Sequence, residues 1–320
     1  MRLAAAIGQF LSGYFATRDR SEKTEKAYAC DLEQFGRFAG AEREVAAIDP
    51  DLVEAWAGEL KRREYAPASI QRKMVSLRVF CHYWVRKGLL EDNPFWRVKL
   101  SFGRIQQLPR TLSEDEMRRL LARARHDWES ATDAANGAGN GTDTRAGGAI
   151  GPHFLALRNY ALLDLLFATG IRVGEAASLT LDSFLEEGRT LRIRGKGRRP
   201  RLAFLVDPRS LELQETYQAA RRRIATDTRA LFLNAFATPL STQGMANALR
   251  KLKDEAGLDR HVTPHMIRHT VATLLLRNGA DIRVVQEFLG HASIATTQRY
   301  TQITKQHLLA VLRANHPSLS

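Results

Sequence analysis

Apolar residues recur at three- and four-residue spacing through the first hundred residues. After Ser21-Glu-Lys-Thr24, which fits the start of a helix, the apolar positions are Tyr28, Leu32, Phe35 and Phe38. One face of such a helix is apolar and the other is charged, as in a helix that packs on a core. The pattern predicts three further helices, over about 1–15, 50–62 and 67–87. Residues 1–100 are therefore predicted to form an all-helical domain.

The pattern changes beyond residue 100. Periodicity is lost over 101–110, which we interpret as a linker, and Ser113 with the acidic residues after it predicts the start of a new helix. Helical spacing then returns in three later segments: 154–169, ended by Gly170; 263–276, opened by Thr263-Pro264; and 281–289, ended by Gly290.

Two extended segments stand between these helices. Residues 190–194 alternate apolar and polar positions, and 202–206 are again extended in character, so they predict a β-hairpin with Lys196 on its glycine-flanked turn. Residues 133–151 repeat Ala, Gly, Asn and Thr with almost no apolar bulk, so burial cannot offset the entropy of ordering them. The prediction is a mainly α protein whose second domain, 111–320, is mixed α+β with a small antiparallel sheet and a flexible insertion at 133–151.

Length and charge narrow the class of protein. A chain of 320 residues normally forms two domains, in agreement with the pattern. A formal net charge of +13 attracts a polyanion, and nucleic acid is the expected partner. Two cysteines, Cys30 and Cys81, are too few for a disulfide framework, and no run of about 18 apolar residues could span a membrane. We expect a cytoplasmic protein whose first apolar residues form a helix and are not a signal sequence.

Two basic segments are candidates for contact with DNA phosphates. The predicted helix over 67–87 has no acidic residue and carries five basic ones, namely Arg72, Lys73, Arg78, Arg86 and Lys87. Residues 189–201 hold seven basic and no acidic residues, among them Arg198, Arg199 and Arg201. Either segment could equally be a solvated basic face. The absence of compensating carboxylates favours phosphate contacts, with apolar positions of the helix turned toward the core.

Six residues in the second half have the chemistry needed to attack a phosphodiester. They are Arg172, Lys196, His265, Arg268, His291 and Tyr300. Each alone has a more ordinary interpretation as a surface, capping or core residue. Glu175, three residues after Arg172, could orient its guanidinium. His261, His265 and His269 recur every four residues, but without an acidic or thiolate partner nearby they do not predict a metal site.

The order and spacing of these residues resemble the tyrosine recombinase family, above all its bacterial XerC/XerD type. The resemblance rests on Thr169-Gly-Ile-Arg172-Val-Gly-Glu175, on the His265-x-x-Arg268 and Leu289-Gly-His291 boxes, and on Tyr300 nine residues later. Weaker similarity, as in Thr24-x-x-Ala-Tyr28-x-x-Asp31-Leu and Asn315-His316-Pro317, covers nearly the whole chain. The insertion and the arginine-rich strand after Lys196 depart from the family pattern without touching a catalytic position.

Chemistry assigns each group a role, and the family pattern agrees. Tyr300 would attack the phosphorus and His265 would accept its proton, because a phenol with a pKa of about 10 needs a base. Arg172 and Arg268 would hold the non-bridging oxygens as charge builds in the transition state, and His291 would add a donor. Lys196 is the candidate acid for the leaving 5′-hydroxyl. Glu175 and His269, expected to point inward, would support these groups from behind.

The resemblance implies a fold, a product and partners. It implies an N-terminal core-binding domain of the SAM-like type and a 3′-phosphotyrosyl intermediate that a 5′-hydroxyl reseals without metal or other cofactor. It also implies a homo- or heterotetramer on two double-stranded DNA sites, with a tail, 305–320, that docks on a neighbouring protomer. A second recombinase and a DNA translocase are possible further partners.

Two other classes of protein share part of this pattern. A type IB topoisomerase-like enzyme would use the same chemistry on one duplex, and a DNA-binding regulator would keep the basic surface without catalysis. The helical N-terminal domain argues against the first, and the complete catalytic set argues against the second. The biological role stays open between resolving chromosome or plasmid dimers and integrating or excising a mobile element. The target DNA sequence does not follow from the residues either.

Overall fold

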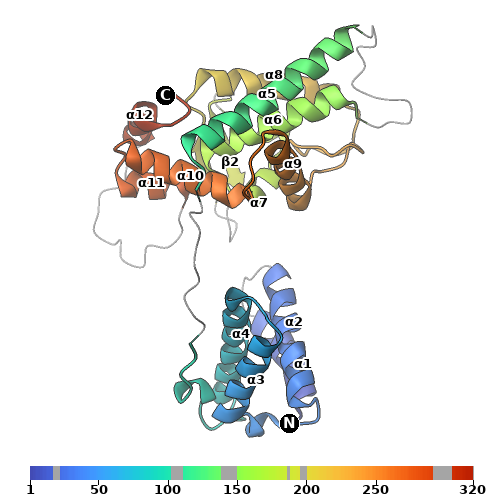
Figure 1. Cartoon of the computed structure of the whole chain (residues 1–320), viewed down its shortest axis with the longest axis vertical. Coiled ribbons are helices and arrows are strands. Elements are labelled where there is room, and N and C mark those ends of the chain that lie inside the picture. The colour runs from blue at the N-terminus through green and yellow to red at the C-terminus, as the bar shows by residue number, and fades with distance from the viewer. Residues whose placement is uncertain are drawn as a thin grey trace. The chain divides into compact units, whose positions relative to one another are not determined.

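The computed structural model describes residues 1–16, 22–101, 111–137, 150–185, 188–194, 200–290 and 305–319. The chain divides into two compact units, Met1–Gln107 and Leu108–Ser320, so the division falls inside the predicted linker (Figure 1). Each unit has its own hydrophobic core. None of the helices in the described ranges combines the length and the hydropathy that a membrane span requires.

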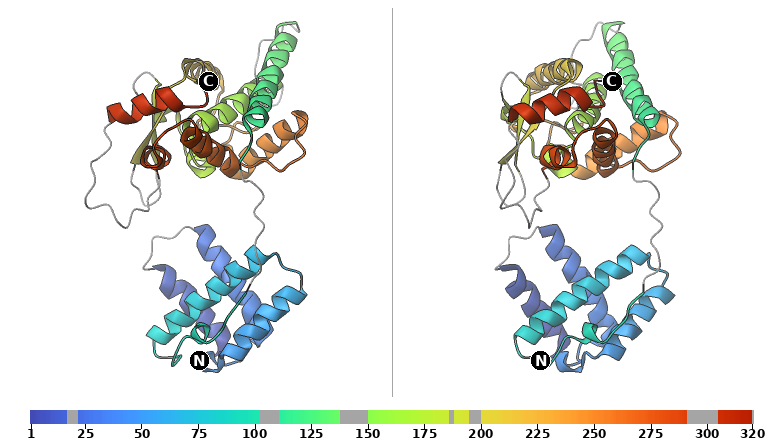
Figure 2. Two further views of the ribbon diagram at one scale, coloured as in Figure 1. Left: turned by 60° about the vertical axis from the view of Figure 1, so that its left-hand side comes forward. Right: turned by 90° about the vertical axis from the view of Figure 1, so that its left-hand side faces the viewer.

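The N-terminal unit is a bundle of four helices. These are α1 (Leu3–Ala16), α2 (Glu22–Ala39), α3 (Pro50–Arg62) and α4 (Pro67–Arg86). The short 3-10 turn η1 (Val45–Ala47) lies between α2 and α3, and a second, η2 (Pro94–Trp96), follows α4. The expected apolar face of α4 is buried, with Leu77 and Phe80 almost fully enclosed. Figure 2 shows the four helices from two further sides. The sequence prediction of an all-helical unit is confirmed.

The C-terminal unit is built around one long apolar helix, α6 (Pro152–Thr169), which is buried on nearly every side. Packed around it are the helices α5 (Glu114–Gly137), α8 (Pro208–Arg223), α9 (Thr242–Glu255) and α10 (Pro264–Arg277). The shorter elements are α7 (Val173–Ala177), η3 (Leu181–Ser183), α11 (Ile282–Leu289) and α12 (Lys305–Asn315). Figure 1 shows α5 running along α6 at one side of the unit.

The two predicted strands pair with each other and belong to a three-stranded antiparallel sheet; the second lies at 200–204 and not at 202–206, and the turn between them is outside the described residues. Its strands are β1 (Phe184–Leu185), β2 (Thr190–Arg194) and β3 (Pro200–Phe204), in the order β1-β2-β3. The register pairs Leu191 with Ala203 and Ile193 with Arg201. Leu191, Ile193 and Ala203 are fully buried, so Arg201 lies on the same, inward face of the sheet. The prediction of a small antiparallel sheet is confirmed, and β1 is an additional strand.

The expected bounds of the insertion need correction. Helix α5 continues through Gly137, and Ile150 is buried with its backbone N–H donating to the carbonyl of Ala235, so the insertion is shorter than 133–151. Its remaining residues, 138–149, lie outside the described ranges. The described part of the tail packs on its own unit, where Leu308 and Leu312 are buried.

Candidate active site and nucleic-acid interface

The site begins where α6 ends. Gly170 adopts a left-handed conformation with φ of 58° and closes the helix with a hydrogen bond from its N–H to the carbonyl of Leu166. A side chain at this glycine would start 2.6 Å from a methyl carbon of Leu289, so the position also requires the small residue. The chain then turns directly into α7, and Arg172 becomes the residue that caps this short helix. The predicted break between two helices thus places Arg172 at the site.

Glu175 holds Arg172 in the way that the three-residue spacing predicts. The Arg172 Nη1 donates to Glu175 Oε1 at 3.0 Å, and the Arg172 backbone N–H donates to Oε2 at 2.8 Å. The Glu175 side chain is only 9% exposed, whereas 41% of the Arg172 side chain faces solvent. The guanidinium is therefore oriented from behind and open on its outer side, which suits a group that receives a phosphate.

Arg268 enters the site from α10 and is more deeply buried than Arg172. Thr263 caps α10 by accepting a hydrogen bond from the Met266 N–H at 3.2 Å, which places Arg268 in the second turn. Its Nη1 donates to the carbonyl of Gly170 at 2.5 Å and its Nη2 to that of Leu289 at 2.6 Å. Burial lowers the pKa of Arg268 to about 10, and the neighbouring charges of Arg172 and Arg201 act in the same direction. At neutral pH the guanidinium still carries its charge.

Arg201 is a third arginine in the same place, which the sequence had assigned to DNA contact on the surface. Its side chain is 16% exposed and donates to Glu175 Oε2 at 2.8 Å. Burial would raise the pKa of the Glu175 carboxyl, but the hydrogen bonds from Arg201 and from the backbone of Arg172, together with both charges, lower it. The expectation that Arg201 projects toward solvent phosphates is wrong.

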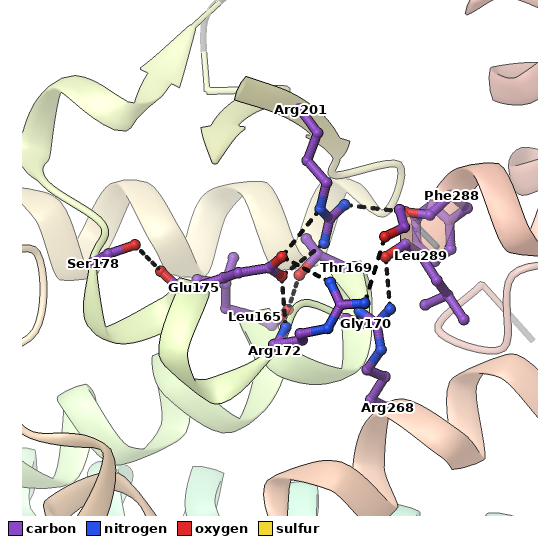
Figure 3. Close-up of polar contacts among 11 residues, drawn as sticks. Leu165, Thr169, Gly170, Arg172, Glu175, Ser178, Arg201, Arg268, Phe288 and Leu289 are labelled. Carbon is purple, nitrogen blue, oxygen red and sulfur yellow. Dashed lines mark hydrogen bonds and ion pairs between the residues drawn. The ribbon is translucent and has the colours of Figure 1, made fainter. Parts of the chain in front are cut away.

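The three arginines share one structural target, the C-terminal end of α11 (Figure 3). Three successive carbonyls there accept hydrogen bonds: Phe288 from Arg201 at 3.3 Å, Leu289 from Arg268 at 2.6 Å, and Gly290 from Arg172 at 3.5 Å. The C-terminal end of a helix leaves its last carbonyls without hydrogen-bond donors and carries a partial negative charge. A guanidinium group supplies both the donors and the compensating positive charge. Three positive charges against the single carboxylate of Glu175 leave a net positive site that can hold a phosphodiester.

Several predicted residues are not placed by the structure. Lys196, His291 and Tyr300 lie outside the described residues, as do Arg198 and Arg199. His291 directly follows Gly290, the last residue of the described range 200–290.

The histidines of α10 face solvent. His265 is exposed in the first turn of the helix, and His269 is exposed as well, so the expectation that His269 points inward is wrong. Helix periodicity explains the difference, since Arg268 and Val271 occupy the buried face and His269 follows Arg268 on the other side. Within the described ranges no cluster of three or more His, Cys, Asp or Glu side chains could hold a metal ion.

A second candidate surface lies in the N-terminal unit, along α4. Arg78, His82, Arg86 and Lys87 are exposed on one side of the helix. Together with Tyr14, Tyr83 and Trp96 they line a groove of about 810 Å³, and the Trp96 side chain at its edge is 71% exposed. Cationic and aromatic side chains on one groove can contact a nucleic-acid backbone and its neighbouring surfaces.

Two of the five predicted phosphate contacts on α4 have a different environment. Lys73 is 3% exposed and donates to Asp31 Oδ1 at 3.0 Å and to Gln34 Oε1 at 2.7 Å, so it is wrong as an exposed DNA contact. Arg72 is half-exposed and donates to Asp31 Oδ2 at 2.6 Å. Ser76 donates to the same carboxylate at 2.9 Å. Asp31 thus joins α2 to α4 and fixes the helix that carries the basic face.

Replacing Asp31 with alanine should destabilise the N-terminal unit strongly. The change leaves the buried ammonium of Lys73 with Gln34 as its remaining hydrogen-bond acceptor, and removing one partner of a buried ion pair costs about 3–5 kcal/mol. Hydrogen–deuterium exchange of the full-length protein, followed over α2 and α4, measures the effect. Glu33→Ala is the matched control, because Glu33 pairs with Arg37 at 3.9 Å on the solvent side of the same helix. Equal exchange in both variants would show that the Asp31 cluster contributes little.

Sequence reasoning did not find the inward position of Arg201 or the role of Asp31. For Arg201 a signal was available, because its cross-strand partner Ile193 belongs to the apolar face of β2. For Lys73 the helical period was the signal, since residue 73 lies between Ile70 and Leu77 on the apolar stripe. The carboxylates that pair with these residues lie far away in the sequence, and no local pattern indicates them.

Two family models match separate parts of this chain. Residues 149–307 match the model of the Phage integrase family, and residues 7–88 match that of the Phage integrase, N-terminal SAM-like domain. The chain is 33% identical to tyrosine recombinase XerC of Listeria monocytogenes serotype 4a (strain HCC23), over 97% of this chain and 96% of the relative. It is 32% identical to tyrosine recombinase XerD of Listeria innocua serovar 6a, over 97% and 98% of the two chains.

A solved structure shares the fold at lower sequence identity. The lambda integrase tetramer bound to a Holliday junction matches with a TM-score of 0.66 and 17% identity, over 95% of this chain and 81% of that one. The arginine site, the SAM-like helical unit and the full-length identity to curated tyrosine recombinases lead to one conclusion. This chain belongs to the phage integrase family and is a tyrosine recombinase, an enzyme that cleaves and rejoins DNA.

Proposed function

We propose that the protein cleaves one strand of double-stranded DNA at a specific site by attack of Tyr300 on the scissile phosphorus. A P–O bond forms to the phenolic oxygen while the bond to the 5′-oxygen breaks, which leaves a 3′-phosphotyrosyl link and a 5′-hydroxyl. A 5′-hydroxyl from another strand then attacks the link, restores the tyrosine and completes the exchange. One phosphodiester is broken and one is formed, so the reaction needs no external energy source.

The observation that carries this proposal is the meeting of Arg172 and Arg268 at the end of α11. The two guanidinium groups come from helices about a hundred residues apart in the sequence, and the carbonyls of Leu289 and Gly290 hold them side by side. The next residue is His291. Fixed donors that converge where charge develops are the main source of transition-state stabilisation in such reactions. His265 would accept the proton of Tyr300, and Lys196 would donate one to the leaving 5′-oxygen.

The partners follow from the same reaction. The exposed basic groove of α4 supports a role in holding the duplex, with Arg78, Arg86 and Lys87 as phosphate contacts. Strand exchange needs two DNA sites, and we propose a tetramer, homomeric or with a second recombinase; the shared fold with lambda integrase, solved as a tetramer on a Holliday junction, supports this assembly.

We further propose that α12 exchanges from its own unit to a neighbouring protomer, with Leu308 and Leu312 as the transferred apolar contacts.

As the finer biological role we propose resolution of chromosome or plasmid dimers in the cytoplasm, with a DNA translocase as a further partner; the alternative is integration or excision of a mobile element. The names of the relatives, tyrosine recombinases XerC and XerD, support the resemblance on which this proposal rests.

A single capture experiment both tests the proposed function and identifies the target DNA sequence. Purified protein is incubated with nicked, sheared DNA of its source genome in the presence of EDTA, and the mixture is denatured. We expect covalent protein–DNA adducts whose sequenced ends converge on one short site, because a nick lets the 5′-hydroxyl fragment diffuse away and prevents religation. Adducts that appear only with added magnesium, or no adducts at all, would contradict the proposed mechanism.

A further inference from the structure

Arg201 occupies the centre of the arginine site in a way that the cleavage chemistry does not require. Its Nε donates to Glu175 Oε1 at 3.3 Å, its Nη2 to Oε2 at 2.8 Å, and its Nη1 to the carbonyl of Phe288 at 3.3 Å. This is the forked, two-point contact that arginine makes with a carboxylate. With three donors engaged and a side chain 16% exposed, Arg201 is built into the protein and not presented to DNA.

The carboxylate of Glu175 is divided evenly between two arginines. Oε1 accepts from Arg172 Nη1 at 3.0 Å and from Arg201 Nε at 3.3 Å, and Oε2 accepts from the Arg172 backbone N–H and from Arg201 Nη2, both at 2.8 Å. These four hydrogen bonds fill the acceptor capacity of the group. One negative charge therefore faces two positive charges, and neither guanidinium is neutralised.

The glycine that precedes His291 makes room for this arrangement. Gly290 has φ of 66°, and a side chain there would start 2.5 Å from the Cδ and 2.7 Å from the Nε of Arg201. The carbonyl of the same glycine accepts from Arg172 at 3.5 Å. Gly290 thus lies against both arginines that share Glu175, which explains on physical grounds why a glycine stands at this position.

We propose that Arg201 is a positioning residue of the cleavage site. Because Arg201 accounts for two of the four hydrogen bonds to the Glu175 carboxylate, that carboxylate orients Arg172 without neutralising the charge of its guanidinium. The inference rests on the proposed function. Without Arg201, Glu175 forms a one-to-one ion pair with Arg172, and the carboxylate neutralises the charge of the Arg172 guanidinium. With Arg201 in place, the charge of Arg172 remains available to the scissile phosphate as that phosphate becomes more negative.

The test measures cleavage and DNA binding separately. Single-turnover cleavage of a nicked half-site by Arg201→Met at saturating DNA should be about 100-fold slower than by the wild type, the loss expected when a reacting group is misplaced. Fluorescence anisotropy should give an unchanged Kd for the half-site. Arg223→Met is the matched control, because Arg223 is an exposed arginine in the last turn of α8, outside both basic segments, and should keep the wild-type cleavage rate.

A second substitution separates charge sharing from simple structural support. Glu175→Gln introduced into Arg201→Met removes the charge that would neutralise Arg172 while keeping an oxygen that can accept its hydrogen bond. We expect the double variant to cleave about tenfold faster than Arg201→Met alone, a coupling of the size found between contacting residues. Arg201→Lys keeps the charge but loses the two-point contact with the carboxylate, and it should cleave faster than Arg201→Met. If Arg201→Met does not fold, Arg201→Lys takes its place in the test.

The outcomes are distinguishable. A weaker Kd with an unchanged cleavage rate in Arg201→Met would make Arg201 a DNA contact and overturn the proposal. A slower rate that Glu175→Gln does not restore would leave only a structural role and would overturn charge sharing. If the wild type itself forms no adduct, the proposed function fails, whatever the variants do.

Discussion

Tyr300→Phe is expected to abolish the covalent protein–DNA adduct while DNA binding persists. The substitution removes one oxygen atom, which is the atom that the proposed mechanism joins to phosphorus, and a phenyl ring cannot replace it as a nucleophile. Because phosphodiesters react extremely slowly without catalysis, we expect no residual adduct within the time of the assay. A denaturing gel of the half-site reaction measures the adduct, and anisotropy measures binding of the same DNA.

The position of the label tests the direction of the reaction as well. A label on the 5′ end of the cleaved strand should stay with the protein, because the proposed link is to the 3′-phosphate, and a label on the 3′ end should be released. Tyr160→Phe is the matched control, since Tyr160 is a half-buried tyrosine of α6 outside the arginine site, and it should form the adduct normally. An adduct that persists in Tyr300→Phe would identify a different nucleophile.

The features predicted correctly from the sequence are those with local causes. Gly170 ends α6 and Gly290 ends α11, each in a left-handed conformation, and Thr263 caps α10 with its side chain. Each of these signals depends on residues within one turn of a helix. The contact between Arg172 and Glu175 is local in the same sense, because three residues bring both side chains to one face. The sequence therefore predicted both the helices and this orienting contact.

The features predicted wrongly concern the direction of charged side chains. Lys73 and Arg201 were expected to face solvent because they are basic, yet both are turned inward by carboxylates 42 and 26 residues away along the chain. Pairing removes most of the penalty of burying a charge, and the partner decides the direction. The periodicity of α4 and the register of β3 both indicated the inward positions. A basic residue at a position that the pattern places in the core therefore predicts a carboxylate partner elsewhere in the chain.

The convergence of the arginines could not be predicted from spacing at all. Arg268 donates to the carbonyl of Gly170, 98 residues away, and to that of Leu289, 21 residues away. The positions of these carbonyls follow from how α6, α10 and α11 pack, and the packing depends on the whole core of the unit. Resemblance to a family named the residues, whereas the structure explains what holds two of them in place.

Arg268→Met should reduce cleavage about 1,000-fold, the upper part of the range for loss of a donor that stabilises a transition state. Arg268 is charged at neutral pH although burial lowers its pKa to about 10, so its charge is held in place at an energetic cost that a bound phosphate would offset. The variant should also be less stable, because the carbonyls of Gly170 and Leu289 lose their donor and each buried unpaired group costs about 1–3 kcal/mol. Single-turnover cleavage and thermal unfolding measure the two effects. Arg277→Met, an exposed position at the far end of the same helix, is the control for both.

A change in the substrate separates the catalytic effect of Arg268 from its structural effect. A methylphosphonate at the scissile position replaces one charged non-bridging oxygen with a neutral methyl group, so an arginine that compensates this charge becomes less important. On this substrate the defect of Arg268→Met, relative to the wild type, should shrink from about 1,000-fold to about tenfold or less. The loss of stability is a property of the protein and should be the same whichever substrate is used. A defect of equal size on both substrates would mean that Arg268 acts only by joining α10 to the ends of α6 and α11.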